Sequence, residues 1–184
     1  MRRRSFISTL IESGQLITDN FDHPILLGEY LLLVPMGVIL KLQEILKEVV
    51  GKETTKKIFF SLGEFQVEAA ARRYMKMFHL EKLDKRKIMD FTIKIIGSLG
   101  WGKFLIKKLS FKEKTAIVIL KGSALAMKYK QIYQKNSDEP IDYWLSGIIA
   151  KHFSVIFETE MEVKEVKCLA MGDPYCEFIA KPKF

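Results

Sequence analysis

The chain has 184 residues, of which 48% are hydrophobic and 28% are charged, and it carries a formal net charge of +8. This length suits one globular domain, and the hydrophobic content excludes an intrinsically disordered chain. The basic residues are scattered and are not interleaved with aromatic side chains. The charge therefore predicts a solvated basic surface and no direct nucleic-acid site.

The N-terminal region predicts neither a signal peptide nor a membrane anchor. Three arginines precede an apolar run that is short, is broken by Glu12 and lacks a small-residue cleavage site. The longest uncharged hydrophobic run, residues 30–40, contains Pro35 and is too short to span a bilayer. We expect a cytoplasmic protein without a membrane span, where two cysteines favour free thiols or a metal site over a structural disulfide.

Helices are predicted in the first half of the chain. Residues 1–34 form an N-terminal extension of uncertain structure, with a short strand near residues 15–18. Pro35 is suited to a helix start, and Gly51 stands where that helix would end. A second, longer helix covers residues 53–79, and Gly63 inside it predicts close packing against another backbone. Its predicted buried stripe consists of Ile58, Phe59, Leu62, Phe65, Ala69, Ala70, Tyr74 and Met77.

Strands and further helices follow in the second half. A third helix over residues 86–99 runs into the glycines of residues 97–102, which allow a tight entry into a strand. Residues 104–109 and 115–120 form a hairpin, Ser123 caps a short helix, and another helix begins at Asp142. With a second hairpin at the C-terminus, this order predicts an α+β fold: a twisted, mainly antiparallel sheet of about four strands with helices packed on it.

The C-terminal hairpin holds both cysteines of the chain. Gly172, Asp173 and Pro174 supply turn chemistry, and a hairpin centred on Gly172 places Cys168 and Cys176 opposite one another. Opposed residues of an antiparallel pair have Cβ atoms roughly 4.5–5.5 Å apart. Two thiols at this distance could share a metal ion, form a cross-strand disulfide or simply pack together.

The same hairpin contains a slip in its alternating pattern. Apolar residues fall on odd positions at Met161 and Val163 but on even positions from Val166 onward. A β-bulge near residues 164–166 would produce this slip, because it absorbs one extra residue. The bulge would let Glu165 and Cys168 face the same side of the strand.

These residues carry a resemblance to a known family. The pattern Glu165-x-x-Cys168-x-Ala-x-Gly172-Asp173-x-x-Cys176-x-Phe178 resembles the signature of the V4R (4-vinyl reductase) domain family. Trp144-x-x-Gly147, Gly100-Trp101-Gly102 and Gly63 also fit its pattern, so the match extends from about residue 35 to residue 181. The resemblance implies a single V4R-like domain over residues 1–184, with a fold like that of the TRAPP trafficking subunits. It also implies a stand-alone, homodimeric hydrocarbon-binding protein.

The resemblance further implies a metal site. In aromatic sensors of this family, the glutamate and the two cysteines bind structural zinc together with a further cysteine upstream. Glu165, Cys168 and Cys176 match, but this chain lacks the upstream cysteine. Counting back without gaps reaches Asp142, which could ligate zinc through oxygen. The alternative is two buried thiols that only pack, and His152 is interpreted as an ordinary surface or core histidine.

Aromatic side chains suggest a ligand cavity. Phe91, Trp101, Phe104 and Trp144 lie on elements that should face the sheet, where they could either fill the core or line a pocket. Together with the resemblance, they predict a non-catalytic domain that binds or senses a small hydrophobic or aromatic molecule. Any regulatory output would then pass through a partner protein.

Two other functions stay open. One is an enzyme or accessory protein of tetrapyrrole vinyl reduction, although no cofactor motif supplies the reductant and the sequence favours a non-catalytic protein. The other is a dimeric scaffold like the trafficking subunits, which predicts a filled core, a large apolar dimer surface and no cavity.

Overall fold

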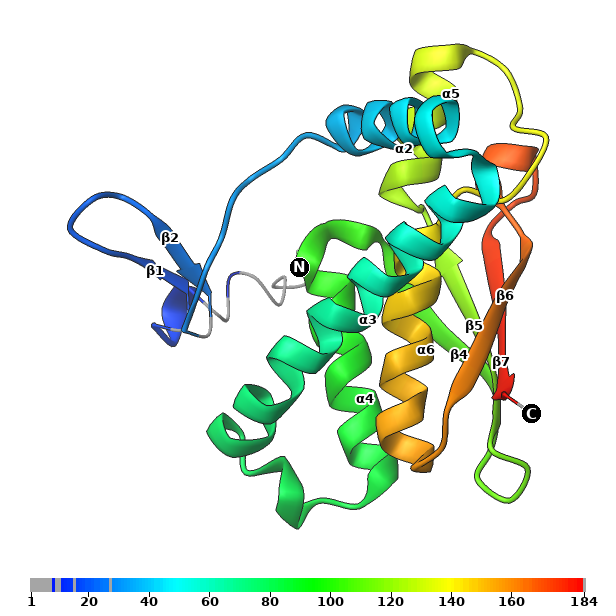
Figure 1. The fold of residues 1–184 in the computed structure, drawn as a ribbon. Coiled ribbons are helices and arrows are strands. Elements are labelled where there is room, and N and C mark those ends of the chain that lie inside the picture. Colours follow the sequence, from blue (N-terminus) through cyan, green and yellow to red (C-terminus); the bar gives the residue numbers. More distant parts are fainter. Residues whose placement is uncertain (1–7, 9–10, 15, 27, 184) are drawn as a thin grey trace, which may run out of the picture.

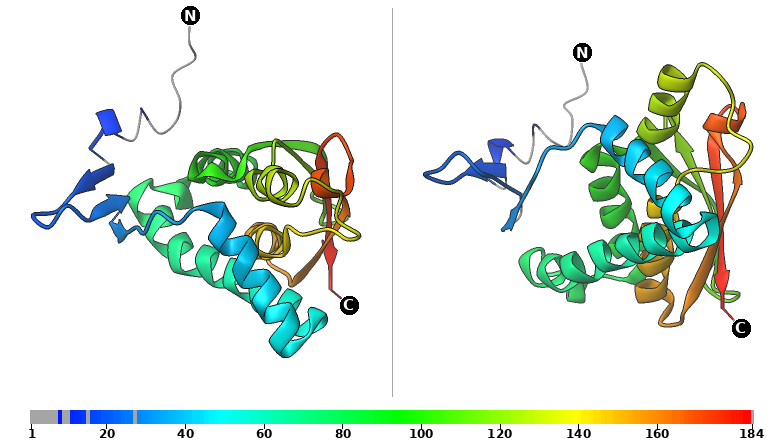
Figure 2. Two further views of the ribbon diagram at one scale, coloured as in Figure 1. Left: turned by 90° about the horizontal axis from the view of Figure 1, so that it is seen from above. Right: turned by 45° about the horizontal axis from the view of Figure 1, so that its top comes forward.

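A four-stranded antiparallel sheet forms the centre of the protein. The computed structural model describes residues 8, 11–14, 16–26 and 28–183. In the sheet the strand order is β4–β5–β7–β6, and the helices lie on one of its faces (Figure 1 and Figure 2). This arrangement confirms the predicted α+β fold with its antiparallel sheet. The strands are β4 (Lys103–Ser110), β5 (Thr115–Lys121), β6 (Met161–Lys167) and β7 (Cys176–Pro182).

The alternating sequence of β5 explains why one face of the sheet is buried. Ala116, Val118 and Leu120 are buried, whereas the residues between them are partly exposed. This period of two is what a strand needs when only one of its faces meets the core. β5 pairs with β4 on one side and with β7 on the other, so the buried face continues across the sheet.

The predicted β-bulge in the C-terminal hairpin is confirmed. β6 pairs antiparallel with β7, and the register shifts between Glu165 and Lys167. A bulge places one extra residue in one strand and redirects the side chains beside it. Glu165 is 7% exposed and shares a face of β6 with Met161 and Val163, and the extra residue after it brings the fully buried Cys168 to the same face.

The helix ends follow local sequence signals. The Ser123 side chain accepts a hydrogen bond from the Ala126 backbone N–H, as predicted for a cap, and Asp84 caps α4 in the same way. The helices are α2 (Met36–Val50), α3 (Lys52–Met77), α4 (Lys85–Ile96), α5 (Ala124–Tyr133) and α6 (Tyr143–Phe157). Short helical turns are η1 (Leu80–Lys82), η2 (Gly97–Trp101) and η3 (Leu169–Met171).

The buried helix α6 lies between the sheet and α3, and it meets α3 backbone to backbone (Figure 1). A Cβ atom added at Gly147 would lie 1.9 Å from the Phe60 carbonyl oxygen. One added at Gly63 would lie 2.1 Å from the Trp144 carbonyl oxygen. The prediction that Gly63 packs against another backbone is therefore confirmed.

The predicted buried stripe of α3 is wrong over much of its length. Phe59 is fully buried, but Leu62, Phe65 and Met77 are 39%, 69% and 39% exposed. Because α3 contacts α6 through the face that carries Gly63, its other apolar residues turn toward a cavity or toward solvent. Apolar spacing identified the helix but not the face that it buries.

The N-terminal segment forms a small sheet of its own, which projects from the body of the protein (Figure 1 and Figure 2). Its strands are β1 (Leu16–Thr18), β2 (Pro24–Leu26) and β3 (Glu29–Tyr30), in the order β1–β2–β3. Leu26 is the buried residue of this unit, and it packs with side chains from both the N-terminal segment and the helical layer: Leu16, Leu31, Tyr74, Phe78 and Leu99. Residues 31–35 connect the unit to α2.

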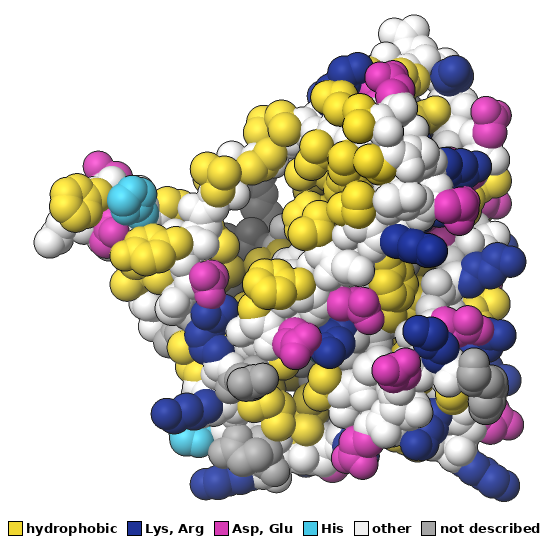
Figure 3. Space-filling model, viewed as in Figure 1, with side chains coloured by type: hydrophobic (Ala, Val, Ile, Leu, Met, Phe, Trp, Pro, Cys, Tyr) yellow, Lys and Arg dark blue, Asp and Glu magenta, His cyan; other side chains and the backbone are white. Residues whose placement is uncertain are grey.

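An apolar stripe on α2 faces solvent. Val38, Leu42, Ile45 and Val49, which we call the α2 stripe, are 53%, 42%, 44% and 73% exposed. Their spacing places them on one side of the helix. Figure 3 shows hydrophobic side chains gathered over α2 and the segment before it. No helix among the described residues is both long and apolar enough to cross a membrane.

Candidate metal centre and ligand cavity

Four potential metal ligands converge where the C-terminal hairpin meets the start of α6. Asp142 precedes α6, Glu165 lies in β6, Cys168 follows β6 and Cys176 begins β7. All four side chains are buried, and one ligand atom from each lies within 4.8 Å of the others. The structure thus brings together the four residues that the sequence proposed, and metal binding by them stays a prediction.

The turn of the hairpin positions the two cysteines. Gly172 has φ = 107°, a conformation that favours glycine, and it ends the η3 turn. The Asp173 carboxylate accepts a hydrogen bond of 2.9 Å from the Cys168 backbone N–H. Both cysteines are free thiols with no exposed surface. The sequence Gly172-Asp173 therefore folds the chain back so that Cys168 and Cys176 point into one buried site.

Hydrogen bonds hold the carboxylates of this site in place. The Asp142 backbone N–H donates to Glu165 Oε2 at 3.1 Å, and the Ser123 hydroxyl donates to Asp142 Oδ2 at 3.0 Å. The Cys176 thiol lies 3.3 Å from the same Asp142 oxygen. Glu165 Oε1, however, is buried without any hydrogen-bond partner. A buried carboxylate oxygen without a donor is destabilising unless a cation or a proton compensates it.

Burial dominates the electrostatics of the site. It raises the pKa of Asp142 to about 7, and burial together with the neighbouring Asp142 charge raises the pKa of Glu165 to about 11. A hydrogen bond from Cys176 lowers the pKa of Cys168 to about 6. Without a bound cation, burial and the mutual repulsion of the acidic groups keep some of them protonated. Two thiolates and two carboxylates form a donor set that suits a tetrahedral zinc ion, so these residues fit that metal.

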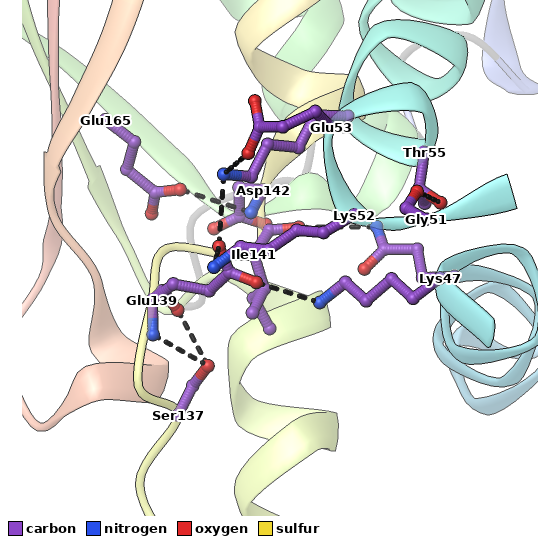
Figure 4. A network of polar contacts seen from close by, with 12 residues as sticks. Lys47, Gly51, Lys52, Glu53, Thr55, Ser137, Glu139, Ile141, Asp142 and Glu165 are labelled. Atoms are coloured by element: carbon purple, nitrogen blue, oxygen red, sulfur yellow. Dashed lines mark hydrogen bonds and ion pairs between the residues drawn. The ribbon is translucent and has the colours of Figure 1, made fainter.

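A second polar network lies beside this site and fixes its outer edge (Figure 4). Glu139 accepts ion pairs from Lys47, Lys52 and Lys56 at 3.2, 2.7 and 3.2 Å. Partial burial opposes ionisation of Glu139, but the ammonium groups of Lys52, Lys56 and Lys47 outweigh it and lower its pKa to about 2. The network ties the corner between α2 and α3 to the segment that leads into Asp142.

A cavity of about 460 Å³ lies among α3, α4 and α6, and the N-terminal unit contributes to one part of its wall. Its volume falls in the range of pockets that bind small molecules. Most of its lining is aliphatic, from side chains such as Leu62, Val67, Ile95 and Ile148. The scaffold alternative predicted a filled core without a cavity, and the structure contains one.

His152 lines this cavity, which the sequence did not predict. The residue is 8% exposed and lies on α6, and its ring nitrogen Nε2 contacts the Thr92 hydroxyl of α4. Burial lowers the pKa of His152 to about 4, so its ring is neutral near pH 7. A lone histidine in an apolar helix carries no signal of this role, because the pairing partner lies 60 residues away.

The four aromatic residues predicted for ligand binding occupy different places. Trp144 lines the cavity, and its indole N–H donates to Gln66 at 2.9 Å. Trp101 and Phe104 are buried in the main core, and Phe91 packs on Phe78 with ring centroids 4.7 Å apart. Phe91, Trp101 and Phe104 are not among the side chains that line the cavity.

Comparison with known sequences places a family model on the C-terminal part of the chain. Residues 121–182, which contain the predicted metal ligands, match the V4R domain. An uncharacterized protein of Methanocaldococcus jannaschii is 30% identical over 138 residues, or 71% of this chain. The match covers 60% of that relative, so the chain spans about three fifths of its length.

Solved structures share the fold. The phenol-responsive sensory domain of the transcription activator PoxR superposes with a TM-score of 0.80 at 13% identity, over 98% of this chain and 91% of that domain. A vinyl-4-reductase family protein from Methanocaldococcus jannaschii superposes with a TM-score of 0.54 at 20% identity, over 100% of this chain and 98% of that protein. A trafficking protein particle complex subunit 3 from Naegleria fowleri, covalently bound to palmitic acid, superposes with a TM-score of 0.54 at 13% identity. This match covers 81% of this chain and 91% of that subunit. At these identities the likeness establishes the fold.

Proposed function

We propose, from the premise that residues 121–182 are a V4R domain, that this protein binds a small hydrophobic or aromatic molecule and acts as a non-catalytic sensor or carrier. The observation that carries the proposal is the cavity of about 460 Å³ among α3, α4 and α6. The PoxR domain with the same fold responds to phenol, which supports a sensing role for this architecture.

The chemistry of the cavity favours binding over catalysis. Its polar side chains are engaged with one another: His152 with Thr92, and Trp144 with Gln66. Such pairs orient a ligand and satisfy buried polar groups, as is usual in mostly apolar binding pockets. The enzyme alternative, vinyl reduction of a tetrapyrrole, would require turnover with an added reductant and a copurifying pigment. Either result would contradict a non-catalytic role.

Filling the cavity tests the proposal. Ala70→Phe adds a ring to a residue that lines the cavity. We therefore expect the variant to lose any hydrophobic ligand that the parent protein keeps through purification or binds when it is supplied. Native mass spectrometry of the purified protein measures the bound ligand directly, and thermal unfolding checks that the variant folds. The control is Met127→Phe, which places the same aromatic side chain at a residue of α5 that is 55% exposed. Equal ligand binding by both variants would contradict a role for this cavity.

We also propose that Asp142, Glu165, Cys168 and Cys176 bind a structural zinc ion. The orphaned Glu165 Oε1 and the mutual proximity of two acids and two thiols support this assignment. The ion would replace protons that burial otherwise forces onto the site. The four residues lie near the edge of the sheet and do not line the cavity. The role of the ion would therefore be to hold the hairpin against the start of α6.

The α2 stripe supports a homodimer. Four neighbouring apolar side chains that are 42–73% exposed on one helix face are unusual for a monomer and typical of an interface. We expect Leu42→Glu to shift the protein toward monomer, because it would place a charge at the centre of the buried contact. Size-exclusion chromatography with light scattering measures the change. Met127→Glu, at an exposed position of α5, is the control, and a monomeric parent protein would contradict the dimer.

A sensor must pass its signal on. We propose that the output of this protein goes through a regulatory protein partner in the cytoplasm and involves no direct nucleic-acid contact. The scattered lysines, several of which pair with acidic neighbours such as Glu53, Glu139 and Glu158, support this view because those that the structure describes form no continuous basic groove.

A further inference from the structure

One arginine stands out in the wall of the cavity. Among the lining residues that the structure describes, Arg73 alone carries a permanent positive charge, and Glu29 alone carries a negative one. Arg73 lies on α3 and forms an ion pair with Glu29 of β3 through one terminal nitrogen, Nη1. The Tyr74 ring lies beside the guanidinium, with its centroid 5.8 Å from Arg73 Cζ.

This ion pair leaves part of the arginine unused. Arg73 Nε is buried and has no hydrogen-bond partner. A guanidinium normally binds a carboxylate through two parallel N–H donors, and this fork gives much of its strength and specificity. Glu29 occupies Nη1 alone, its side chain is 54% exposed and it belongs to a strand of two residues. A better-placed carboxylate could therefore displace it.

The rest of the cavity lining indicates what chemistry the remainder of the ligand has. Beyond the Arg73 region, the lining is mainly aliphatic, and its polar groups are already paired as His152 with Thr92 and Gln66 with Trp144. An aliphatic chain satisfies such walls without leaving polar atoms unpaired. The cavity thus combines one unsatisfied charged donor with an apolar space of about 460 Å³.

We propose that the ligand is a carboxylic acid with an aliphatic body, a fatty acid, whose carboxylate binds Arg73 in place of Glu29. This proposal rests on the proposed function and names its ligand class. The carboxylate accepts hydrogen bonds from Nε and a terminal nitrogen of Arg73, and the chain extends between α3, α4 and α6. Glu29 moves into water, where its charge is solvated.

Exchange at Arg73 also gives the protein a signal. The Arg73–Glu29 pair ties β3 of the projecting N-terminal sheet to α3. When a fatty acid takes Arg73, that tie is lost, and the N-terminal unit keeps its apolar contacts around Leu26. Ligand binding therefore changes how firmly this unit is held, which a partner protein could detect.

Matched ligands and variants test the proposal. Lauric acid and dodecanol share an alkyl chain and differ at the head group, so we expect the acid to bind the parent protein at least about tenfold more tightly in isothermal titration calorimetry. Arg73→Met should weaken lauric acid binding by about tenfold or more and leave dodecanol binding unchanged. Glu29→Gln should tighten lauric acid binding, because it removes the competing carboxylate.

A distant ion pair provides the controls. Lys85 and Glu158 form an exposed pair at 2.8 Å that does not line the cavity, so Lys85→Met and Glu158→Gln should leave the binding of both ligands unchanged. Equal affinities for acid and alcohol that Arg73→Met does not alter would overturn the fatty-acid proposal and leave the cavity proposal intact. Binding of neither ligand would overturn the fatty-acid proposal, whereas a parent protein that retains no small molecule and binds no apolar probe would refute the proposed function. If Arg73→Met fails to fold, Glu29→Gln decides, since unchanged or weaker acid binding contradicts the proposal.

Discussion

Gly147→Ala is expected to lower the free energy of unfolding by at least about 3 kcal/mol, the upper part of the usual range for overpacking a tight contact. The added Cβ would lie 1.9 Å from the Phe60 carbonyl oxygen and 2.8 Å from its carbonyl carbon. Backbone atoms cannot rotate away as a side-chain end can, so α3 and α6 must separate. For a chain of this size the loss corresponds to a fall in melting temperature of roughly 6–12 °C.

Gly37→Ala is the matched control for this variant. Gly37 also belongs to a helix, in the first turn of α2, but a Cβ there would meet only the side-chain atoms Lys128 Cε at 3.5 Å and Ile132 Cδ1 at 3.6 Å. Alanine is a better helix former than glycine by up to about 1 kcal/mol, so Gly37→Ala should be neutral or stabilising. Urea denaturation measures both variants. A Gly147→Ala protein as stable as the parent would show that the α3–α6 crossing is looser than the structure places it.

Removal of metal is expected to destabilise the protein about as strongly. A ligand present at 1,000 times its dissociation constant stabilises the folded state by about 4 kcal/mol, so stripping zinc with a strong chelator should lower the melting temperature by roughly 8–16 °C. Cys176→Ser should abolish zinc binding and make the protein insensitive to chelator. Elemental analysis of protein purified without chelator, together with thermal unfolding, measures both effects.

Glu165→Gln distinguishes a metal site from buried thiols that only pack. If zinc binds, the amide removes an anionic ligand, and the variant should lose both metal and stability. If no metal binds, the same change replaces a carboxyl whose pKa is raised to about 11 with a neutral group of similar shape, and stability should be little changed. Glu162→Gln, at an exposed glutamate of β6, controls for the loss of one negative charge.

Only part of the metal-ligand group could be predicted from local sequence. The bulge at Glu165 and the turn at Gly172 could be predicted because both arise within a few residues, from the strand period and from backbone freedom. Asp142 joins them from 23 residues before Glu165. Its place came from a family resemblance, because no local pattern connects a helix start to a later hairpin.

Helix faces were harder to predict than helices. The apolar residues of α3 gave its extent, but Leu62 and Phe65 border the cavity and stay partly exposed because the glycine face of α3 meets α6 instead. Apolar spacing shows that a helix has a hydrophobic side. It does not distinguish a side that packs in the core from one that borders a cavity or awaits a partner.

The sequence by itself determined the features that a few neighbouring residues decide: the antiparallel hairpins, the helix cap at Ser123, and the bulge that brings Glu165 and Cys168 to one side of the strand. Only the tertiary structure decided where the cavity lies, that His152 and Arg73 border it, and that the α2 stripe faces solvent. The physical reason is that cavities and exposed faces are properties of several elements packed together. Each helix can have a regular apolar spacing and still leave a cavity or an uncovered side, which no single segment encodes.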